Sequence, residues 1–274
     1  QIISKNNLNG QRNIYLPNLI DESNLLNLKF KKIEKNGTLI RSKGMSIKIN
    51  KEKKNIFIAQ ESSSDWILFS EADLTDWKII FKGKNNNNAI LLDKKSRLND
   101  FGMTGCLNFY KTKFMNTTIL TEDGSCEDSI NIIDSRGNIN EIRVKNAISD
   151  AIDIDFSNIK IDSINVYEAG NDCLDVSGGN YSLVSLSLSR CGDKGISVGE
   201  KSNLKANNVI INTASIGVSS KDLSETVIKK GNFVDIRNCY EAAQKKQEFG
   251  GAKLMFGTLM CDGGFIKDDQ SIVN

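Results

Sequence analysis

The sequence predicts an all-β protein folded as a single right-handed parallel β-helix, a solenoid with coils of about 22 residues. The first observation is a repeat in which a charged residue and a spacer precede an apolar-x-apolar triplet. Its four copies are Asp128-Ser-Ile-Asn-Ile132, Asp150-Ala-Ile-Asp-Ile154, Asp172-Cys-Leu-Asp-Val176 and Lys194-Gly-Ile-Ser-Val198. The second is another apolar series at the same spacing, Ile142, Ile164 and Leu186. The third is strand-type alternation between Gly/Asn/Asp/Ser turns, without the helix-length apolar stripe of leucine-rich or ankyrin arrays.

A coil of this kind is stable only in a stack, because one short strand cannot bury its own apolar face. Coils stacked at roughly 4.8 Å pair each backbone with its neighbours and enclose a continuous interior of Ile, Leu and Val. Equivalent positions of successive coils then form rows along the axis. Any functional group at a repeated position therefore becomes a row of such groups.

The chain divides into a lead-in and one β-helix. Residues 1–36 show no clear period and are expected to cap the first coil, whose bare edge would otherwise pair with another chain. Residues 37–274 are expected to form the β-helix, most regular over 105–222, with a loop or insertion near 241–251. The alternating runs 38–41, 45–49, 55–59, 66–69 and 77–81 are read as less regular early coils. Core packing is favoured for Trp66 and Trp77, because each opens an apolar run, and stacking on a sugar ring is the alternative. The run Asn85–Asn88 is expected to be an exposed turn.

Composition narrows the classes of function. The formal charge of +2 and the lack of an arginine-rich strip argue against nucleic acid as a partner. No apolar run approaches the roughly 18 residues of a membrane span. The chain starts at Gln1 without a Met or a signal peptide, so we expect a mature or trimmed product whose location its N-terminus does not reveal. An extracellular or cell-envelope location is favoured for a protein directed at a polysaccharide.

Histidine and cysteine usage restrict the chemistry further. The 274 residues contain no histidine, which removes the commonest general base and every histidine-containing zinc site. The six cysteines form no Cys-x-x-Cys pattern. Cys239 and Cys261 are 22 residues apart, within disulfide reach if they lie on adjacent coils. The alternative is that cysteines fill small buried positions, as Cys191 would in a row with Ala147 and Ala169.

Three segments on successive coils resemble the motifs of polygalacturonase-type glycoside hydrolases in the pectin-lyase-like superfamily. They are Ser149-Asp-Ala-Ile-Asp153, Gly170-Asn-Asp-Cys-Leu174 and Gly192-Asp-Lys-Gly-Ile-Ser-Val-Gly199, where the family carries Asn-Thr-Asp-Gly, Gly-Asp-Asp-Cys and Gly-His-Gly. Asp150 matches the first aspartate and Asp172 the second of the Asp-Asp pair. Asn171 replaces the family's general acid, and Asp193 and Lys194 occupy the neighbourhood of its histidine. The Arg-x-Lys substrate clamp has no match, and the resemblance covers about 75 residues.

The repeated aspartates also carry a physical argument of their own. Asp128, Asp150 and Asp172 would lie on adjacent rungs within about 5 Å, so at least one pKa must rise unless a charge compensates. Lys194 on the next rung, a bridging Ca²⁺ or a shared proton would each relieve this repulsion. In the structural alternative, each aspartate caps a turn by accepting hydrogen bonds from the backbone.

A second polar row occupies the middle of each apolar-x-apolar triplet and is expected on the outer face of the same strands. It comprises Asn131, Asp153, Asp175 and Ser197, extended by Asp155. Asp153, Asp155 and Asp175 are the candidate calcium ligands. The structural alternative is a solvated sheet face that serves solubility alone.

Two functions remain open. In the first, the protein binds or cleaves an acidic polysaccharide along the Asp-rich face. Asp150, Asp172, Lys194 and Lys221 are then the candidate catalytic residues, as hydrolytic carboxylates or as a lysine base for β-elimination, and Asn171, Asp193, Glu200 and Lys201 contact substrate. The default reading of Glu200, Lys201 and Lys221 is a solvated, salt-bridged surface. In the second, the β-helix is a non-catalytic, structural or adhesive module of a larger surface or envelope protein.

Overall fold

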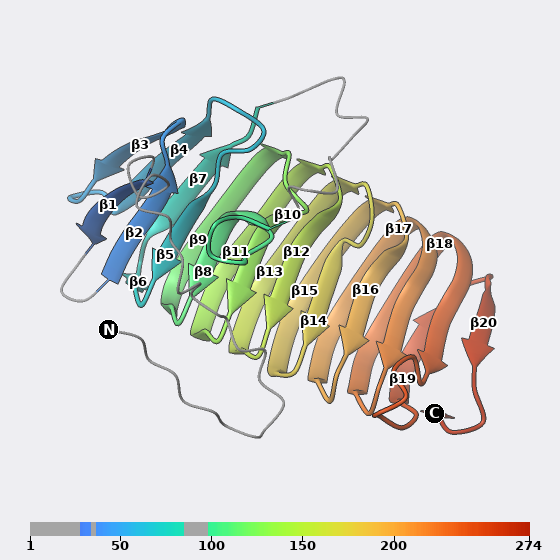
Figure 1. The fold of residues 1–274 in the computed structure, drawn as a ribbon. Helices are drawn as coiled ribbons and strands as arrows, with labels where there is room; N and C mark the ends of the chain where they lie inside the picture. The colour runs from blue at the N-terminus through green and yellow to red at the C-terminus, as the bar shows by residue number, and fades with distance from the viewer. Residues whose placement is uncertain (1–27, 34–36, 85–97) are drawn as a thin grey trace.

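The computed structural model describes residues 28–33, 37–84 and 98–274. The described part is all β, a solenoid of about nine turns whose parallel coils repeat about every 22 residues (Figure 1). None of the described residues forms a helix that could cross a membrane. The predicted fold class is therefore confirmed, while the Asn85–Asn88 run and most of the predicted cap lie outside the described residues.

Each coil contributes one strand to each of two stacks, which we call the first and the second ladder. The first ladder contains β5 (Ile67–Ser70), β8 (Gly105–Tyr110), β10 (Asp128–Ile133), β12 (Asp150–Asp155), β14 (Leu174–Ser177), β16 (Lys194–Gly199), the last parts of β17 (Asn203–Lys221) and β18 (Glu225–Ala243), and β20 (Gly264–Lys267). The second contains β4 (Asn55–Gln60), β7 (Lys78–Lys82), β9 (Lys113–Gly124), β11 (Arg136–Ala147), β13 (Asn158–Ala169), β15 (Asn180–Cys191), the first parts of β17 and β18, β19 (Lys253–Met260) and β21 (Ile272–Val273). The short β6 (Asp73–Thr75) pairs with the start of β9.

The core lies between the two ladders and follows the predicted rows. Ile130, Ile152, Leu174 and Ile196 come from four successive strands of the first ladder, and all are completely buried. The second ladder contributes the facing row, in which Ile142, Ile164 and Leu186 are in register with one another. Burying each such side chain contributes about 1.5–3 kcal/mol to the free energy of unfolding. Burial of these interior rows is therefore the main contribution that keeps the coils in register.

The corners of the coil are built from residues in the left-handed conformation. One corner carries Lys111 (φ 51°), Asp134 (φ 49°), Phe156 (φ 50°) and Gly178 (φ 63°) at a spacing of 22 or 23 residues. A second corner, at the end of each second-ladder strand, carries Asp123, Asn146, Glu168, Arg190, Thr213 and Asp235, with φ between 57° and 71°. Asn and Asp enter this region most readily among non-glycine residues, which accounts for their recurrence at the turns.

The N-terminal strands differ from the expectation. The runs 38–41 and 45–49 were predicted as early coils, but β2 (Gly37–Ser42) pairs antiparallel with both β1 (Leu28–Ile33) and β5, and β3 (Met45–Asn50) pairs antiparallel with β4. The parallel stack therefore begins with β4 and β5. The pattern could not reveal this, because alternation places side chains on two faces in either strand direction.

Both tryptophans are buried, as predicted. Trp77 lies in the main core. Trp66 belongs to a smaller apolar cluster with Ile40, Leu68, Phe101 and Met103, and its ring packs edge-on against Phe101 at 5.5 Å. Near the other end, the segment between Gln244 and Ala252 forms no strand and connects β18 to β19, within the region where a loop was expected.

All six cysteines form disulfides: Cys106–Cys126, Cys173–Cys191 and Cys239–Cys261. Cys191 does occupy the same register as Ala169, as the packing alternative required, but it is also bonded to Cys173. The pairing of Cys239 with Cys261 is the one that their 22-residue spacing suggested.

Candidate functional site

Two of the predicted aspartates, Asp150 and Asp172, cap the backbone of the following coil, whereas Asp128 accepts a hydrogen bond from the Thr104 hydroxyl. Asp128 and Asp150 are direct partners in the first ladder, and Asp172 follows on the next coil. The amide N–H of Asp172 donates to Oδ1 of Asp150 at 2.8 Å, and the amide N–H of Lys194 donates to Oδ1 of Asp172 at 2.9 Å. An aspartate is therefore useful at these two positions, because its carboxylate satisfies a backbone donor that has entered the turn.

Five predicted site residues form one connected network around these carboxylates. The side-chain amide of Asn171 donates to Oδ1 of Asp150 at 2.6 Å. The ammonium of Lys194 lies 3.3 Å from Oδ1 of Asp172 and donates to Oδ2 of Asp193. Both the backbone-capping alternative and the neutralisation by lysine are thus present in the same cluster.

Burial sets the protonation of this network. It raises the pKa of Asp172 to about 7, against the opposing effect of the Lys194 charge, and it also raises the pKa of Asp150. For Lys194, burial works against the charged form, but its hydrogen bond to Asp193 and the charge of Asp172 outweigh it and raise the pKa. At neutral pH the cluster therefore holds a carboxyl group close to half-protonation beside a lysine that stays charged.

The second polar row lies on the outer side of the first ladder. Asn131, Asp153, Asp175 and Ser197 follow one another in register. The side-chain amide of Asn131 donates to Oδ2 of Asp153 at 3.1 Å, whereas its buried Oδ1 has no hydrogen-bond partner. Burial, with the added repulsion of Asp155, raises the pKa of Asp153 far above its usual range.

The structure brings the candidate calcium ligands onto neighbouring rungs. Asp153 and Asp175 are register partners, and Asp155 lies two residues along the strand from Asp153. Among residues 28–33, 37–84 and 98–274, however, no three His, Cys, Asp or Glu side chains converge in an arrangement that could hold a metal ion. Calcium binding by these residues stays a prediction.

Glu200, Lys201 and Lys221 lie apart from the Asp172 network. Glu200 and Lys201 occupy the turn after β16, where Glu200 pairs with Lys246 and the Lys201 ammonium lies 5.6 Å from the Phe249 ring centroid. Lys221 reaches back along the first ladder to donate to Ser197 at 2.7 Å. These three residues contact the loop before β19 or the outer polar row, and not Asn171 or Asp193.

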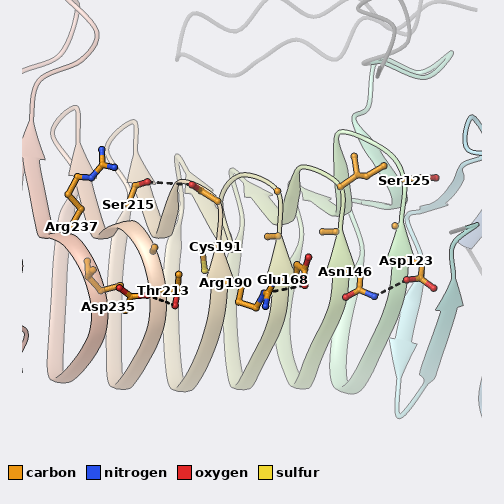
Figure 2. Close-up of a pocket in the computed structure, with 18 of the residues that line it drawn as sticks. Asp123, Ser125, Asn146, Glu168, Arg190, Cys191, Thr213, Ser215, Asp235 and Arg237 are labelled. Carbon is orange, nitrogen blue, oxygen red and sulfur yellow. Dashed lines mark hydrogen bonds and ion pairs between the residues drawn. The ribbon is translucent and has the colours of Figure 1, made fainter. Parts of the chain in front are cut away.

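A groove that the sequence reasoning missed runs along the corner between the second ladder and the first (Figure 2). It has a volume of about 1120 Å³ and spans the coils from Asp123 to Arg237. Its floor consists mainly of small residues at one coil position: Gly124, Ala147, Ala169, Cys191 and Ala214. Small side chains at that position leave the space open above the backbone.

One wall of the groove is the row of left-handed corner residues that immediately precede the floor. Their side chains interact in pairs between neighbouring coils (Figure 2). Asn146 donates to Asp123 at 3.0 Å, Arg190 lies 3.3 Å from Glu168, and Thr213 donates to Asp235 at 3.0 Å. The wall thus presents amide, carboxylate, guanidinium and hydroxyl groups at the coil spacing.

The other wall contains Ser125, Ile148, Gly170, Gly192, Ser215 and Arg237. Glycine is required at two of these positions, because a Cβ on Gly170 would lie 2.0 Å from the Ile148 carbonyl oxygen and one on Gly192 would lie 2.1 Å from the Gly170 carbonyl oxygen. Gly170 directly precedes Asn171 and Asp172, and Gly192 directly precedes Asp193 and Lys194. The groove therefore borders the predicted network without including its side chains.

The sequence does contain a signal for the groove. Asn146-Ala147, Glu168-Ala169 and Arg190-Cys191 repeat a polar residue before a small one at 22-residue spacing. The pattern is weaker than the aspartate repeat because the polar residue changes in each coil.

No protein-family model, no curated protein and no solved structure matches the chain.

Proposed function

We propose that this protein is a carbohydrate-directed β-helix that binds an extended polysaccharide along the groove between Asp123 and Arg237. The observation that supports this is the repetition of hydrogen-bonding side chains at one coil position above a floor of small residues. A linear polymer presents its own repeated donors and acceptors, so it can engage several coils at once. A hydroxyl-rich chain suits the mixture of amide, carboxylate, guanidinium and hydroxyl groups on the wall.

The charged side chains of the groove indicate which kind of polysaccharide it would bind. The groove is lined by Lys84, Arg190 and Arg237 and by Asp123, Glu168 and Asp235. Guanidinium groups bind carboxylates in a bidentate manner, so Arg190 and Arg237 are the candidate contacts to the acidic groups of a uronate polymer. The three disulfides are typical of an oxidising compartment and support an extracellular or cell-envelope location.

Filling the groove tests the proposal. Ser215 lies on the wall and donates weakly to the Gly192 carbonyl oxygen, so Ser215→Trp should obstruct the groove and lower affinity for a bound glycan at least tenfold. Affinity electrophoresis against a panel of uronate-containing and neutral polysaccharides measures the change. Ser182→Trp is the matched control, because Ser182 is exposed in β15 and is not part of the groove. Equal binding by both variants would place the ligand elsewhere, and binding of extended peptides with no glycan bound would overturn the substrate class.

A catalytic role is the second candidate, favoured by the Asp172 pKa of about 7 beside Asp150. A carboxyl group poised near neutral pH is suited to general acid catalysis. The charged state of Lys194 argues against it as the base of a β-elimination, since a raised pKa leaves it protonated at neutral pH.

Asp172→Asn separates catalysis from binding. The amide oxygen can still accept the Lys194 backbone hydrogen bond, but the side chain can no longer deliver an acidic proton. If the cluster hydrolyses the bound polymer, turnover measured by reducing-end release should fall by a factor of about 10² or more while affinity is retained. An absence of turnover in the unmodified protein, with binding intact, would instead support the non-catalytic structural or adhesive module.

A further inference from the structure

The charged side chains of the groove balance one another. Its basic lining residues are Lys84, Arg190 and Arg237, and its acidic ones are Asp123, Glu168 and Asp235. Arg190 lies 3.3 Å from Glu168, and Lys82, just outside the lining, lies 3.4 Å from Asp123. Such a lining has no net attraction for a polymer that carries an acidic group on every sugar, so the positions of the separate charges decide which polymer fits.

Arg237 takes no part in this pairing. Its side chain is exposed at the C-terminal end of the groove, and it makes no hydrogen bond or ion pair with any residue that the structure describes. Asp235 lies on the opposite wall, where it accepts a hydrogen bond from the Thr213 hydroxyl at 3.0 Å. The planar guanidinium of Arg237 can therefore bind a ligand carboxylate through two parallel hydrogen bonds.

Arg190 has part of its guanidinium group available. The ion pair with Glu168 is made by Nε, and 59% of the Arg190 side chain is accessible to solvent. The guanidinium carbon lies 6.0 Å from the centre of the Tyr167 ring, which supports the side chain from one side. Within residues 28–33, 37–84 and 98–274 the two terminal amino groups make no hydrogen bond, so they can donate to a ligand while Nε stays with Glu168.

The two arginines flank the coil that carries Ala214. Arg190 belongs to the preceding coil and Arg237 to the following one, each roughly 4.8 Å away along the axis. They come from opposite walls of the groove (Figure 2), and the coil between them presents the hydroxyl groups of Thr213 and Ser215. An acidic group bound over Ala214 therefore receives hydrogen bonds from both sides, and the hydroxyl groups suit the sugar that carries it.

The coil that carries Ala147 has the opposite surroundings. Asp123 belongs to the preceding coil and Glu168 to the following one. Among the described residues that line the groove, none at this coil or at its two neighbours is a cation. A ligand carboxylate over Ala147 would be repelled by both side chains, whereas a sugar hydroxyl can donate to either.

We infer that the ligand is a polysaccharide in which acidic sugars are separated by neutral ones, with an acidic sugar over Ala214 and a neutral sugar over Ala147. The inference rests on the proposed function, because it specifies the substrate class of the same groove. A uronate homopolymer places a carboxylate over both coils, so the attraction at Ala214 is offset by the repulsion at Ala147. A neutral polymer leaves Arg237 without a partner.

Three probes separate recognition of the acid from recognition of the sugar chain. They are a polysaccharide of alternating uronate and neutral hexose, the same polymer with its carboxyl groups reduced, and a uronate homopolymer. Isothermal titration calorimetry should show that the alternating polymer binds about tenfold more tightly than either of the others. Arg237→Gln should remove most of the difference between the alternating polymer and its reduced form. Arg143→Gln is the matched control, because Arg143 is exposed in β11 outside the groove, and it should preserve that difference.

A second variant should gain affinity. Glu168→Gln removes one of the two acids beside Ala147 and releases Nε of Arg190, so the uronate homopolymer should bind about tenfold more tightly. Asp162→Asn changes the net charge of the protein equally but lies in β13 outside the groove, and it should leave homopolymer affinity unchanged. Circular dichroism and melting temperature verify that every variant is folded.

The outcomes separate this inference from the proposed function. Failure to bind any of the three polymers overturns both. Equal affinity for the alternating polymer and its reduced form, or tightest binding of the homopolymer, overturns the inference alone and leaves the groove as a glycan site. The same is true if Arg143→Gln and Arg237→Gln have equal effects, since that result shows a response to net charge and not to a placed arginine.

Discussion

At the scale of single residues, Asp172 combines two roles in one carboxylate. Its Oδ1 accepts the backbone N–H of Lys194 and lies 3.3 Å from the Lys194 ammonium, while only 6% of the side chain is accessible to solvent. The hydrogen bond and the ion pair favour the charged form, and burial opposes it. The result is a group that folding makes harder to ionise, and its titration is therefore coupled to stability.

The sign of this coupling gives a pH dependence. The pKa of Asp172 rises from about 3.9 in an unfolded chain to about 7 in the folded state, so the folded protein binds more protons between these values. The contribution of Asp172 to the free energy of unfolding should be greatest below pH 4 and should fall as the pH rises through 7. The total fall is up to a few kcal/mol, at about 1.4 kcal/mol per pKa unit. Urea denaturation from pH 4.5 to 8 measures the slope.

Asp172→Asn should reduce this slope, because the amide does not titrate. Asp150 and Asp153, whose pKa values burial also raises, contribute in the same direction and leave a residual slope. Asp162→Asn, a change at an exposed carboxylate paired with Lys160, is the control and should preserve the slope. A stability that increases from pH 4.5 to 8 in the unmodified protein would contradict this account.

At the scale of elements, adjacent coils approach each other closely at the turn from the second ladder to the first. Gly170 packs against the Ile148 carbonyl group so tightly that a Cβ would lie 2.0 Å from its oxygen, whereas a Cβ on Gly199 would meet nothing nearer than 3.8 Å. Gly170 precedes the first-ladder strand β14, and Gly199 ends the first-ladder strand β16. A side chain is excluded at Gly170 but has room at Gly199.

Alanine substitutions should separate these two positions. Gly170→Ala should force adjacent coils apart and destabilise the protein by about 1–3 kcal/mol, with a lower melting temperature. Gly199→Ala, which makes only ordinary contacts, should change the melting temperature little. Equal melting temperatures for both variants would show that the turn can relax, and that the coil spacing is not set there.

The elements also show what the sequence could and could not predict. The rows of Ile130 and Ile142 were predictable because a buried row demands the same apolar type in every coil. The direction of β2 and β3 was not, since alternation is identical in parallel and antiparallel strands. The groove was missed because its wall needs only a polar residue in a left-handed turn, and Asn146, Glu168 and Arg190 meet that need with different side chains.

At the scale of the whole molecule, the aspartate repeat illustrates how structure and chemistry overlap. Spacing placed Asp150 and Asp172 on adjacent coils, and the motif resemblance added Asn171, yet neither could distinguish a catalytic carboxylate from one that caps the next coil. The structure shows that capping occurs, through the Asp172 and Lys194 amides. Glu200 and Lys201 were predicted to contact substrate together with this network, but Lys194 begins β16 whereas Glu200 and Lys201 follow its end.

The three disulfides have a mechanical consequence for the chain. Each closes a loop, with sequence separations of 20, 18 and 22 residues. Tension applied between the two chain ends passes through the sulfur–sulfur bonds and bypasses the residues inside the loops. The loop from Cys239 to Cys261 includes all of β19, and its 22 residues would otherwise extend by roughly 70 Å. The stretched length of the oxidised chain is therefore shorter than that of the reduced chain, and β19 carries no load when the molecule is pulled.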